Sequence, residues 1–411
     1  MIPPRTCRSC GGAGLQLVLS LGKMPLANAF LKSEQLAEPE PMYPLDLAFC
    51  PRCTLVQITE TVPPQQLFSN YLYFSSFSET ILRESKLLAD RLIESRRLDS
   101  TSLVVELGSN DGYQLQYFVA KGIPVLGIDP ALNVVEVAQA KGVRTMCGFF
   151  GEKLADALSS KNSSADVIIA RNVLAHVADL NGFVEGIRIL LKRGGVAVIE
   201  VPYLKDLIDH REFDTIYHEH LCYFSVFALD QLFKRHEMEL VDVERIPMHG
   251  GSLRLYVTRV RHAQPLVSVG SLLQDEARWG VGQLESYLGF ARDVERIKVS
   301  LRSLLQSLRR RGNRIAAYGA AAKGTVLLNY CKIGKELVDF VVDASPYKQG
   351  RCIPGVHVRI YPPSRLLKQM PEYTLLLAWN LVDEVLEQQT EYQRRGGKFI
   401  IPIPTPRVIG E

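Results

Sequence analysis

Four cysteines near the N-terminus stand in two C-x-x-C pairs, Cys7 with Cys10 and Cys50 with Cys53. Each pair places two thiolates on one tight turn, and two such turns can close a tetrahedron around Zn²⁺. Because nothing nearby offers an open coordination position or an acid–base partner, the spacing predicts a structural zinc site. Free thiols that share this spacing by coincidence are the alternative.

A glycine-containing turn, VVELGSNDG (104–112), is the second chemical signal. Gly108 and Gly112 let the backbone approach a ligand and free amides at the start of the next helix. Asp129 ends the following apolar run, 21 residues after Gly108. A carboxylate at that place can accept hydrogen bonds from both ribose hydroxyls of a dinucleotide or of S-adenosylmethionine.

Three details of this turn favour S-adenosylmethionine. The turn lacks the G-x-G-x-x-G glycine that admits a pyrophosphate. Glu106 lies inside the strand that precedes the turn, and Asp111 can meet the ammonium group of a methionine moiety. A plain strand–helix turn followed by a chance aspartate is the alternative.

The stretch Tyr217-His218-Glu219-His220 packs four polar, proton-exchanging side chains together. In an extended conformation His218 and His220 share one face, and Tyr217 and Glu219 share the other. The spacing does not fit the H-E-x-x-H motif of metalloproteases. A histidine is a natural base for a proton next to a carbonyl, and a carboxylate can orient it. The alternative is a hydrogen-bonded surface strand.

Weaker candidates come from three loops. His176 follows an apolar strand, where a lone histidine is more often a structural hydrogen-bonding group. His249, Gly250 and Gly251 form a tight turn whose glycines permit close backbone approach, unless it is a plain turn. Tyr73 stands in a polar-aromatic run that is either a lid or a linker.

A second strand–turn–helix pattern lies near the C-terminus, in AAYGAAAKG (316–324). A turn of small residues with one lysine, Lys323, suits a phosphate-bearing ligand. Asp343 ends the next apolar run, and Trp379 and Asn380 end another. Polar groups at strand ends favour a ligand crevice, with a purely structural domain as the alternative.

These candidates are positioned by a predicted α/β alternation. Helical spacing over 114–122 and 134–142 separates short apolar runs, and one or two further helices are expected within 271–311. The predicted strands of the central sheet are 103–108, 125–129, 166–172 and 195–202, followed by 253–260, and those of the C-terminal sheet are 314–320, 337–343, 373–380 and the run KFIIPIP (398–404).

The length of 411 residues allows two to four domains at roughly 100–200 residues each. We expect three: a zinc-stapled module at 1–66, an α/β domain at 67–270, and a helical linker with a second α/β domain at 271–411. A composition of 47% hydrophobic and 22% charged residues supports packed cores.

Charge and hydropathy narrow the expected partners and location. A net charge of +4 is too weak to indicate nucleic acid or an anionic membrane. No run of 18 apolar residues appears, and the N-terminus lacks the apolar core of a signal peptide, so we expect a cytoplasmic protein. Thiols stay reduced there, and the remaining cysteines are expected to be core thiols: Cys147, Cys222, Cys331 and Cys352.

Taken together, the motifs resemble the S-adenosylmethionine-dependent C-methyltransferases of nucleotide-linked deoxysugars. The resemblance covers nearly the whole chain and rests, in order, on C-x-x-C…C-x-x-C, ELGSNDG, RNVLAHV, YHEHLCYFS, HGGSLR, YGAAAKG and LAWN. It implies a zinc-binding module, a class I (Rossmann-like) methyltransferase domain and a second Rossmann-like domain.

The resemblance also implies a reaction of deoxysugar and antibiotic biosynthesis. A dTDP-linked 4-keto-deoxyhexose is methylated on the carbon next to its ketone, C3, through an enolate. The family's base corresponds to His220, with Tyr217 and Glu219 orienting it, and His176 and Tyr73 line the pocket. A second histidine so close, His218, leaves the choice of base open.

The predicted sites are then complete. The cofactor site comprises Glu106, Gly108, Asn110, Asp111, Gly112, Asp129 and Asn172. The nucleotide-sugar site comprises His249, Gly250, Gly251, Lys323, Asp343, Trp379 and Asn380.

Three other functions stay open at this point. An O- or N-methyltransferase of a related sugar or secondary metabolite would use the same cofactor site. A non-catalytic scaffold would have degenerate Rossmann domains, and a nicotinamide oxidoreductase would not depend on a methyl donor. We expect a monomer or a weak homo-oligomer.

Overall fold

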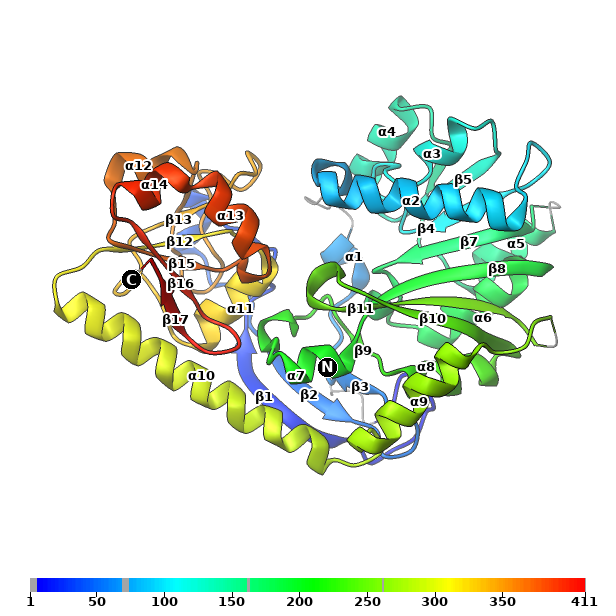
Figure 1. Ribbon diagram of the computed structural model, residues 1–411, viewed down its shortest axis with the longest axis horizontal. Helices are drawn as coiled ribbons and strands as arrows, with labels where there is room; N and C mark the ends of the chain where they lie inside the picture. Colours follow the sequence, from blue (N-terminus) through cyan, green and yellow to red (C-terminus); the bar gives the residue numbers. More distant parts are fainter. Residues whose placement is uncertain (1–5, 69–73, 161–162, 261, 411) are drawn as a thin grey trace.

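The computed structural model describes residues 6–68, 74–160, 163–260 and 262–410. Within these ranges the strands form three sheets, and the N-terminal sheet lies low between two larger α/β units (Figure 1). Among the described residues, no helix is long and apolar enough to cross a bilayer.

The N-terminal sheet is antiparallel, with strand order β1-β2-β3-β9. Its strands are β1 (Gln16–Met24), β2 (Tyr43–Phe49), β3 (Val56–Ile58) and β9 (Cys222–Tyr223). The last strand comes from the middle of the chain and pairs Tyr223 with Val56. A segment directly after the Tyr217–His220 stretch therefore completes this sheet, which the sequence did not predict.

The central sheet has strand order β10-β11-β8-β7-β4-β5-β6. Strands β4 to β8 run parallel, and β10 and β11 form an antiparallel hairpin at one edge. The predicted alternation is confirmed. The strands are β4 (Val104–Leu107), β5 (Val125–Asp129), β6 (Thr145–Cys147), β7 (Ala165–Arg171), β8 (Leu191–Pro202), β10 (Met238–Ile246) and β11 (Ser252–Arg259).

Helices cover both faces of this sheet, which explains the continuous apolar runs of its strands. Val104 and Val167 pack in one core cluster with α2 and α3, and the alternate residues Val105 and Ile168 belong to a second cluster with α6. The helices of this unit are α1 (Pro64–Phe68), α2 (Glu79–Arg96), α3 (Gln116–Val119), α4 (Leu132–Ala140), α5 (Glu152–Ser159), α6 (Leu180–Leu190), α7 (Leu204–Asp209) and α8 (Val226–Arg235).

Two helices, α9 (Val267–Trp279) and α10 (Glu285–Arg310), lead to the C-terminal unit, and α10 runs beneath it (Figure 1). The sheet of the C-terminal unit has strand order β14-β13-β12-β15-β16-β17, and of these described strands only β17 is antiparallel to its neighbour. The elements are β12 (Ile315–Tyr318), α11 (Ala322–Tyr330), β13 (Val341–Val342), β14 (Ile360–Tyr361), α12 (Ser364–Gln369), β15 (Tyr373–Leu376), α13 (Val382–Gln388), α14 (Thr390–Arg394), β16 (Lys398–Ile401) and β17 (Arg407–Ile409).

Three local expectations were wrong. The run 337–343 forms a strand only at Val341–Val342, because its first residues are buried in a turn that ends the preceding connection. Strand β15 stops at Leu376, and Trp379 begins a 3-10 turn, η6 (Trp379–Leu381). Cys147 is exposed rather than a core thiol, because β6 is an edge strand of the central sheet.

We predict that Leu301→Ala lowers the free energy of unfolding by about 2–5 kcal/mol. Leu301 lies on the buried face of α10 and is fully enclosed, so truncation leaves a cavity in the large core cluster to which this face belongs. Val299→Ala on the exposed face of the same helix is the matched control, and it should change stability by less than about 0.5 kcal/mol. Denaturant unfolding measures both, and equal losses would contradict the packing described for α10.

Candidate active site

The four paired cysteines lie in two facing turns beside the N-terminal sheet. Their Sγ atoms all lie within 4.8 Å of one another, with Cys7–Cys53 at 3.5 Å and Cys10–Cys50 at 3.6 Å. These separations are too long for disulfides. They suit four thiolates around one Zn²⁺ ion.

The turn after β4 depends on its two glycines. Gly108 has φ +66°, and a Cβ there would lie 2.4 Å from Cγ2 of Val173. Gly112 has φ +78°, and a Cβ there would lie 2.9 Å from Cγ2 of Val143. Between them Asn110 takes φ +49°, a left-handed conformation that asparagine tolerates. Glycine at both positions therefore lets the backbone of this turn pack closely against the two valines.

Asp129, at the end of β5, organises the same turn. Its Oδ2 accepts a hydrogen bond from the Asn110 amide at 2.9 Å, and its Oδ1 accepts one from the Ala131 amide at 2.9 Å. Burial raises the pKa of this carboxyl, while both amides act in the opposite direction. The carboxylate therefore lies at the strand end that the sequence predicted, already oriented by two backbone donors.

Several oxygens of the predicted cofactor site are buried without a hydrogen-bond partner in the described part of the chain, among them Oδ1 of Asp111 and Oδ1 of Asn172. The other oxygen of Asp111 accepts from Nζ of Lys141 at 2.9 Å. Glu106 is completely buried, which raises its pKa strongly, and Arg171 acts in the opposite direction. Unsatisfied buried acceptors mark a place where a ligand can donate.

A buried ionic group that was not predicted from the sequence, formed by Glu200 and two arginines, is hydrogen-bonded to Gln114 directly after this turn. Glu200 on β8 accepts from Nε of Arg171 and from Nε of Arg254, each at 2.7 Å. Nη1 of Arg171 also donates to Ser85 Oγ at 2.6 Å and to Gln114 Oε1 at 3.0 Å. The two guanidinium groups hold the pKa of Glu200 below its usual range. No sequence motif links these residues, because they come from separate strands that are neighbours only in the folded sheet.

The Tyr217–His220 stretch forms a turn and not the surface strand that was the alternative. The His220 amide donates to the Tyr217 carbonyl at 2.9 Å, which brings the Tyr217 hydroxyl to 2.8 Å from Nε2 of His220. Nδ1 of His220 lies 3.0 Å from the Thr215 carbonyl oxygen. His218 points elsewhere, with Nε2 at 3.0 Å from the Pro44 carbonyl oxygen. The two histidines therefore do not share a face.

His176 and Glu219 complete this cluster. The His176 and His220 rings lie 4.7 Å apart, edge to face, and Nδ1 of His176 donates to the Glu219 carbonyl at 2.7 Å. Burial lowers the pKa of His176 to about 4 and raises that of Glu219 to about 7. Asn28 of the N-terminal module, absent from our prediction, contacts the Glu219 carboxylate. Tyr73 lies outside the described residues.

The glycine pair before β11 sits against acidic side chains. A Cβ on Gly250 would lie 2.5 Å from Glu212 Oε1, and one on Gly251 would lie 2.3 Å from Asp206 Oδ2. Burial raises the pKa of Glu212 to about 8. The close approach of these carboxylates explains why both positions require glycine. The side chain of His249 is not among the described ones.

Three of the C-terminal candidates come together. Nζ of Lys323 donates to Asn380 Oδ1 at 3.0 Å and lies 4.8 Å from the ring centroid of Trp379. Nε1 of Trp379 donates to Oδ2 of Asp214 at 2.7 Å, and burial raises the pKa of that carboxyl to about 6. Asp343 is apart from them, accepting the amides that follow β12 and β13.

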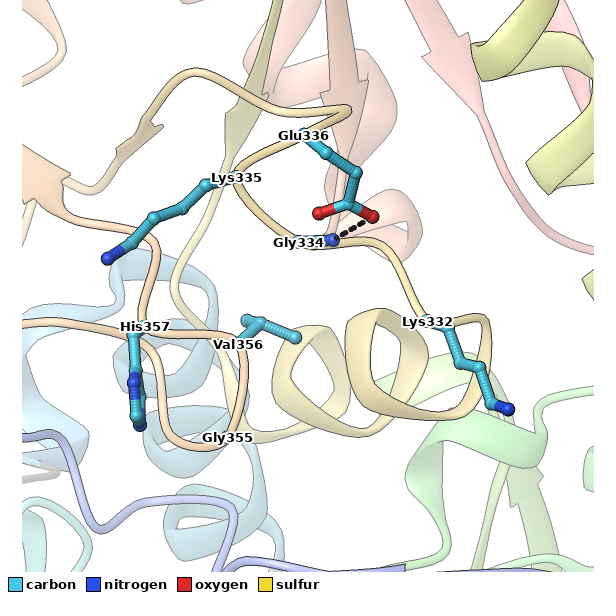
Figure 2. A pocket seen from close by; sticks show the side chains of 7 residues that line it. All are labelled: Lys332, Gly334, Lys335, Glu336, Gly355, Val356 and His357. Carbon is cyan, nitrogen blue, oxygen red and sulfur yellow. Dashed lines mark hydrogen bonds between the residues drawn. The ribbon is translucent and has the colours of Figure 1, made fainter.

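A surface cavity of about 390 Å³ in the C-terminal unit contains none of the predicted site residues. Figure 2 shows that the Glu336 carboxylate there turns back to the Gly334 amide, at 3.2 Å. The cavity is lined by Lys332, Gly334, Lys335, Glu336, Gly355, Val356 and His357.

Comparison with known proteins identifies the parts of the chain. Residues 7–68 match the model of a zinc binding domain, 80–243 that of a methyltransferase domain, and 247–404 that of the C-methyltransferase C-terminal domain. Over 410 residues the chain is 35% identical to C-methyltransferase NovU of Streptomyces niveus, covering 99% of this chain and 97% of that protein. The chain belongs to this family of C-methyltransferases.

Other similarities of this C-methyltransferase cover only part of the chain. It is 28% identical over 97 residues to a ubiquinone biosynthesis O-methyltransferase of Bartonella quintana, covering 23% of this chain and 39% of that protein. The structure of magnesium protoporphyrin IX methyltransferase from Synechocystis with bound SAM aligns over 43% of this chain and 79% of the other, with 14% identity and a TM-score of 0.34.

Membership makes this C-methyltransferase an S-adenosylmethionine-dependent enzyme with a zinc-binding domain and a class I methyltransferase fold. The residues present fit both groups. Four clustered thiols match zinc, and unsatisfied acceptors beside a turn that requires glycines match a cofactor that carries an ammonium group and hydroxyls. The roles of single residues at the cofactor turn remain predictions.

We predict that Cys50→Ser abolishes zinc binding, because a hydroxyl replaces one of four thiolate ligands. Metal analysis of protein purified without chelator should give about one zinc per chain for the wild type and a small fraction of that for the variant. The melting temperature should fall as well, because binding free energy of a structural metal is folding free energy. Cys147→Ser, at an exposed cysteine away from the cluster, is the control. Full zinc content in Cys50→Ser would contradict the assignment.

Gly108→Ala should raise the dissociation constant of S-adenosylmethionine at least tenfold. The left-handed φ costs an alanine roughly 1–2 kcal/mol, and its Cβ collides with Val173, so the turn must move. Gly194→Ala, where a Cβ meets nothing within 4 Å, is the matched control. Calorimetric titration measures both variants. Wild-type affinity in Gly108→Ala would place the cofactor elsewhere.

Proposed function

We propose that this enzyme methylates a nucleotide-linked 4-keto-deoxysugar, dTDP-linked, on the carbon next to the ketone, C3, as a step of deoxysugar biosynthesis for an antibiotic. The proposal rests on the motif resemblance and on one observation in the site. His220 has a defined tautomer, with a hydroxyl at its basic nitrogen, in a half-buried cluster with Tyr217 and His176.

The tautomer follows from the hydrogen bonds. A carbonyl oxygen only accepts, so Nδ1 of His220 carries the proton that it shares with Thr215, and Nε2 carries the lone pair. The Tyr217 hydroxyl then donates to Nε2. Nε2 is the atom that accepts a proton from substrate, once the hydroxyl turns away. A neutral imidazole with its other nitrogen anchored is the usual arrangement of a general base.

The neighbouring groups support proton removal from carbon. The ketone acidifies the adjacent C–H, and loss of that proton to Nε2 of His220 gives an enolate. The Tyr217 hydroxyl, displaced from Nε2, is available to donate to the enolate oxygen. His176, neutral because burial lowers its pKa to about 4, adds no positive charge beside the protonated base.

Bound S-adenosylmethionine supplies an electrophilic methyl group on a sulfonium. We assign its adenosine and methionine parts to the turn after β4, with Asp129 on the ribose and Asp111 toward the ammonium group. Glu106, Asn110 and Asn172 stand around that turn. Zinc has a structural role, because its four cysteine ligands leave no open position.

The nucleotide part of the substrate is assigned to the face between the catalytic and C-terminal units. An ammonium group comes from Lys323 on α11. An aromatic face and an amide come from Trp379 and Asn380, which follow β15. His249 belongs to the backbone turn that approaches the same region, and Asp343 stands at the neighbouring strand end. Tyr73 is assigned to the sugar pocket by the motif match alone.

The base assignment predicts that His220→Asn lowers kcat by roughly 10²–10⁴-fold, the usual contribution of a general base. The affinity for S-adenosylmethionine should not change, because His220 lies outside the cofactor turn. In D2O the wild type should also exchange the proton next to the ketone when S-adenosylhomocysteine replaces the methyl donor. The variant should not. Proton NMR follows both reactions.

His218→Asn is the matched control, because His218 is bonded to the Pro44 carbonyl and lies away from His176. Its kcat should stay within tenfold of wild type. If His218→Asn loses activity and His220→Asn keeps it, the base is His218. A product with an O–CH3 instead of a C–CH3 signal would replace C-methylation of the sugar by O-methylation.

A further inference from the structure

A segment of the N-terminal module, residues 27–40, joins the module to the C-terminal unit. We call it the bridging segment. Thr325 Oγ1 on α11 donates to the Ala27 carbonyl at 2.9 Å. Leu31 and Cys352 exchange backbone hydrogen bonds of 3.1 and 2.8 Å, as in an antiparallel bridge. The segment is thereby attached at one side to the outermost part of the C-terminal fold.

The far end of the bridging segment is attached as well. Glu40 Oε2 accepts from the Gly355 amide at 2.8 Å and lies 3.1 Å from Nε2 of His357. Nζ of Lys348 lies over the Phe30 ring, 5.4 Å from its centroid. Since these contacts are spread along the segment, its path between the two units is fixed at both ends.

The side chain of Asn28, in the same segment, contacts the catalytic unit instead of the C-terminal unit. Its Nδ2 lies 2.7 Å from Oε1 and 2.9 Å from Oε2 of Glu219. In the described part of the chain no other group donates to this carboxylate, and Glu219 as a whole is only 4% exposed. A buried carboxylate with a single donor depends on that donor for its orientation, because leaving it unpaired is costly.

Glu219 in turn contacts the candidate catalytic cluster through its backbone. Its carbonyl accepts the Nδ1 proton of His176 at 2.7 Å, and the next residue is His220. A rotation of Glu219 about its own chain would move both imidazoles, since one is bonded to its carbonyl and the other follows it directly. Asn28 is therefore hydrogen-bonded to the side chain of Glu219, and His176 is hydrogen-bonded to its backbone carbonyl.

We propose that Asn28 is a positioning residue of the active site, acting through Glu219 on His176 and His220. The inference rests on the proposed role of the His220 cluster in proton removal. The zinc-binding module thus supplies an active-site support as well as a fold element. The C-terminal unit holds that support in place through Thr325.

The kinetic test is Asn28→Ala in the full-length, zinc-loaded enzyme. We expect kcat to fall about ten- to a hundredfold, because displacements of about 1 Å at a catalytic group have effects of this size. The KM for S-adenosylmethionine and the zinc content should not change. Ser33→Ala, an exposed position on the same bridging segment, is the matched control and should keep wild-type kcat. A wild-type kcat in Asn28→Ala overturns the proposal.

A double-mutant cycle separates positioning from general loosening of the fold. If Asn28 acts through Glu219, then Asn28→Ala should lower kcat less than about threefold further when Glu219 is already alanine. Fully multiplicative losses in the double variant overturn the proposal. If Asn28→Ala does not fold, Thr325→Val replaces it, since that variant removes only the anchor of the bridging segment and should lower kcat in the same Glu219-dependent way.

A substrate-free measurement keeps this inference distinct from the proposed function. In ¹⁵N-histidine-labelled protein, the Nδ1–H signal of His176 should shift or broaden in Asn28→Ala and stay in place in Ser33→Ala. An unchanged His176 signal overturns the inference whatever the substrate. A shifted signal in an enzyme whose wild type methylates no 4-keto sugar would support the positioning role and refute only the proposed function.

Discussion

The hydrogen bond from Nδ1 of His220 to the Thr215 carbonyl orients the proposed base, because it decides which ring nitrogen carries the lone pair. Five residues of chain separate the two groups, so the bond exists only if the chain turns between them. The turn also brings Tyr217 onto Nε2. An extended strand would have pointed Tyr217 and His220 to opposite faces, and no acid–base pair would have formed.

Burial gives this cluster its unusual electrostatics. The pKa of Glu219 is raised to about 7, that of Asp214 to about 6, and that of His176 is lowered to about 4, each mainly by removal from water. Desolvation disfavours the charged form of every one of these groups. Against this, the charged form of Glu219 is favoured by Asn28, and that of Asp214 by Lys323 and by Trp379. These donors come from two different parts of the chain.

The sequence predicted what local patterns encode. Continuous apolar runs indicated the central sheet because its strands are buried on both faces, and the glycines and Asp129 at strand ends indicated the cofactor turn. Contacts between distant segments were not predictable. Asn28 meets Glu219 across 191 residues, and the pairing of β3 with β9 also joins segments that are distant in the sequence. The turn at Tyr217–His220 was not predictable either, because four polar residues carry no hydrophobic period to separate a turn from a strand.

The His220 turn is short and polar, with little apolar side-chain area of its own to hold it, and its surroundings fix it from both ends. Before it, Asp214 is bonded to Trp379 of the C-terminal unit, one residue from the Thr215 carbonyl. After it, Cys222 begins β9, which pairs with β3 of the zinc-stapled sheet. Moving either outer unit would pull on one end of the turn. In the proposed mechanism Nε2 of His220 stays aligned while all three units remain docked, so the zinc site and the C-terminal sheet would both act on a proton transfer that neither touches.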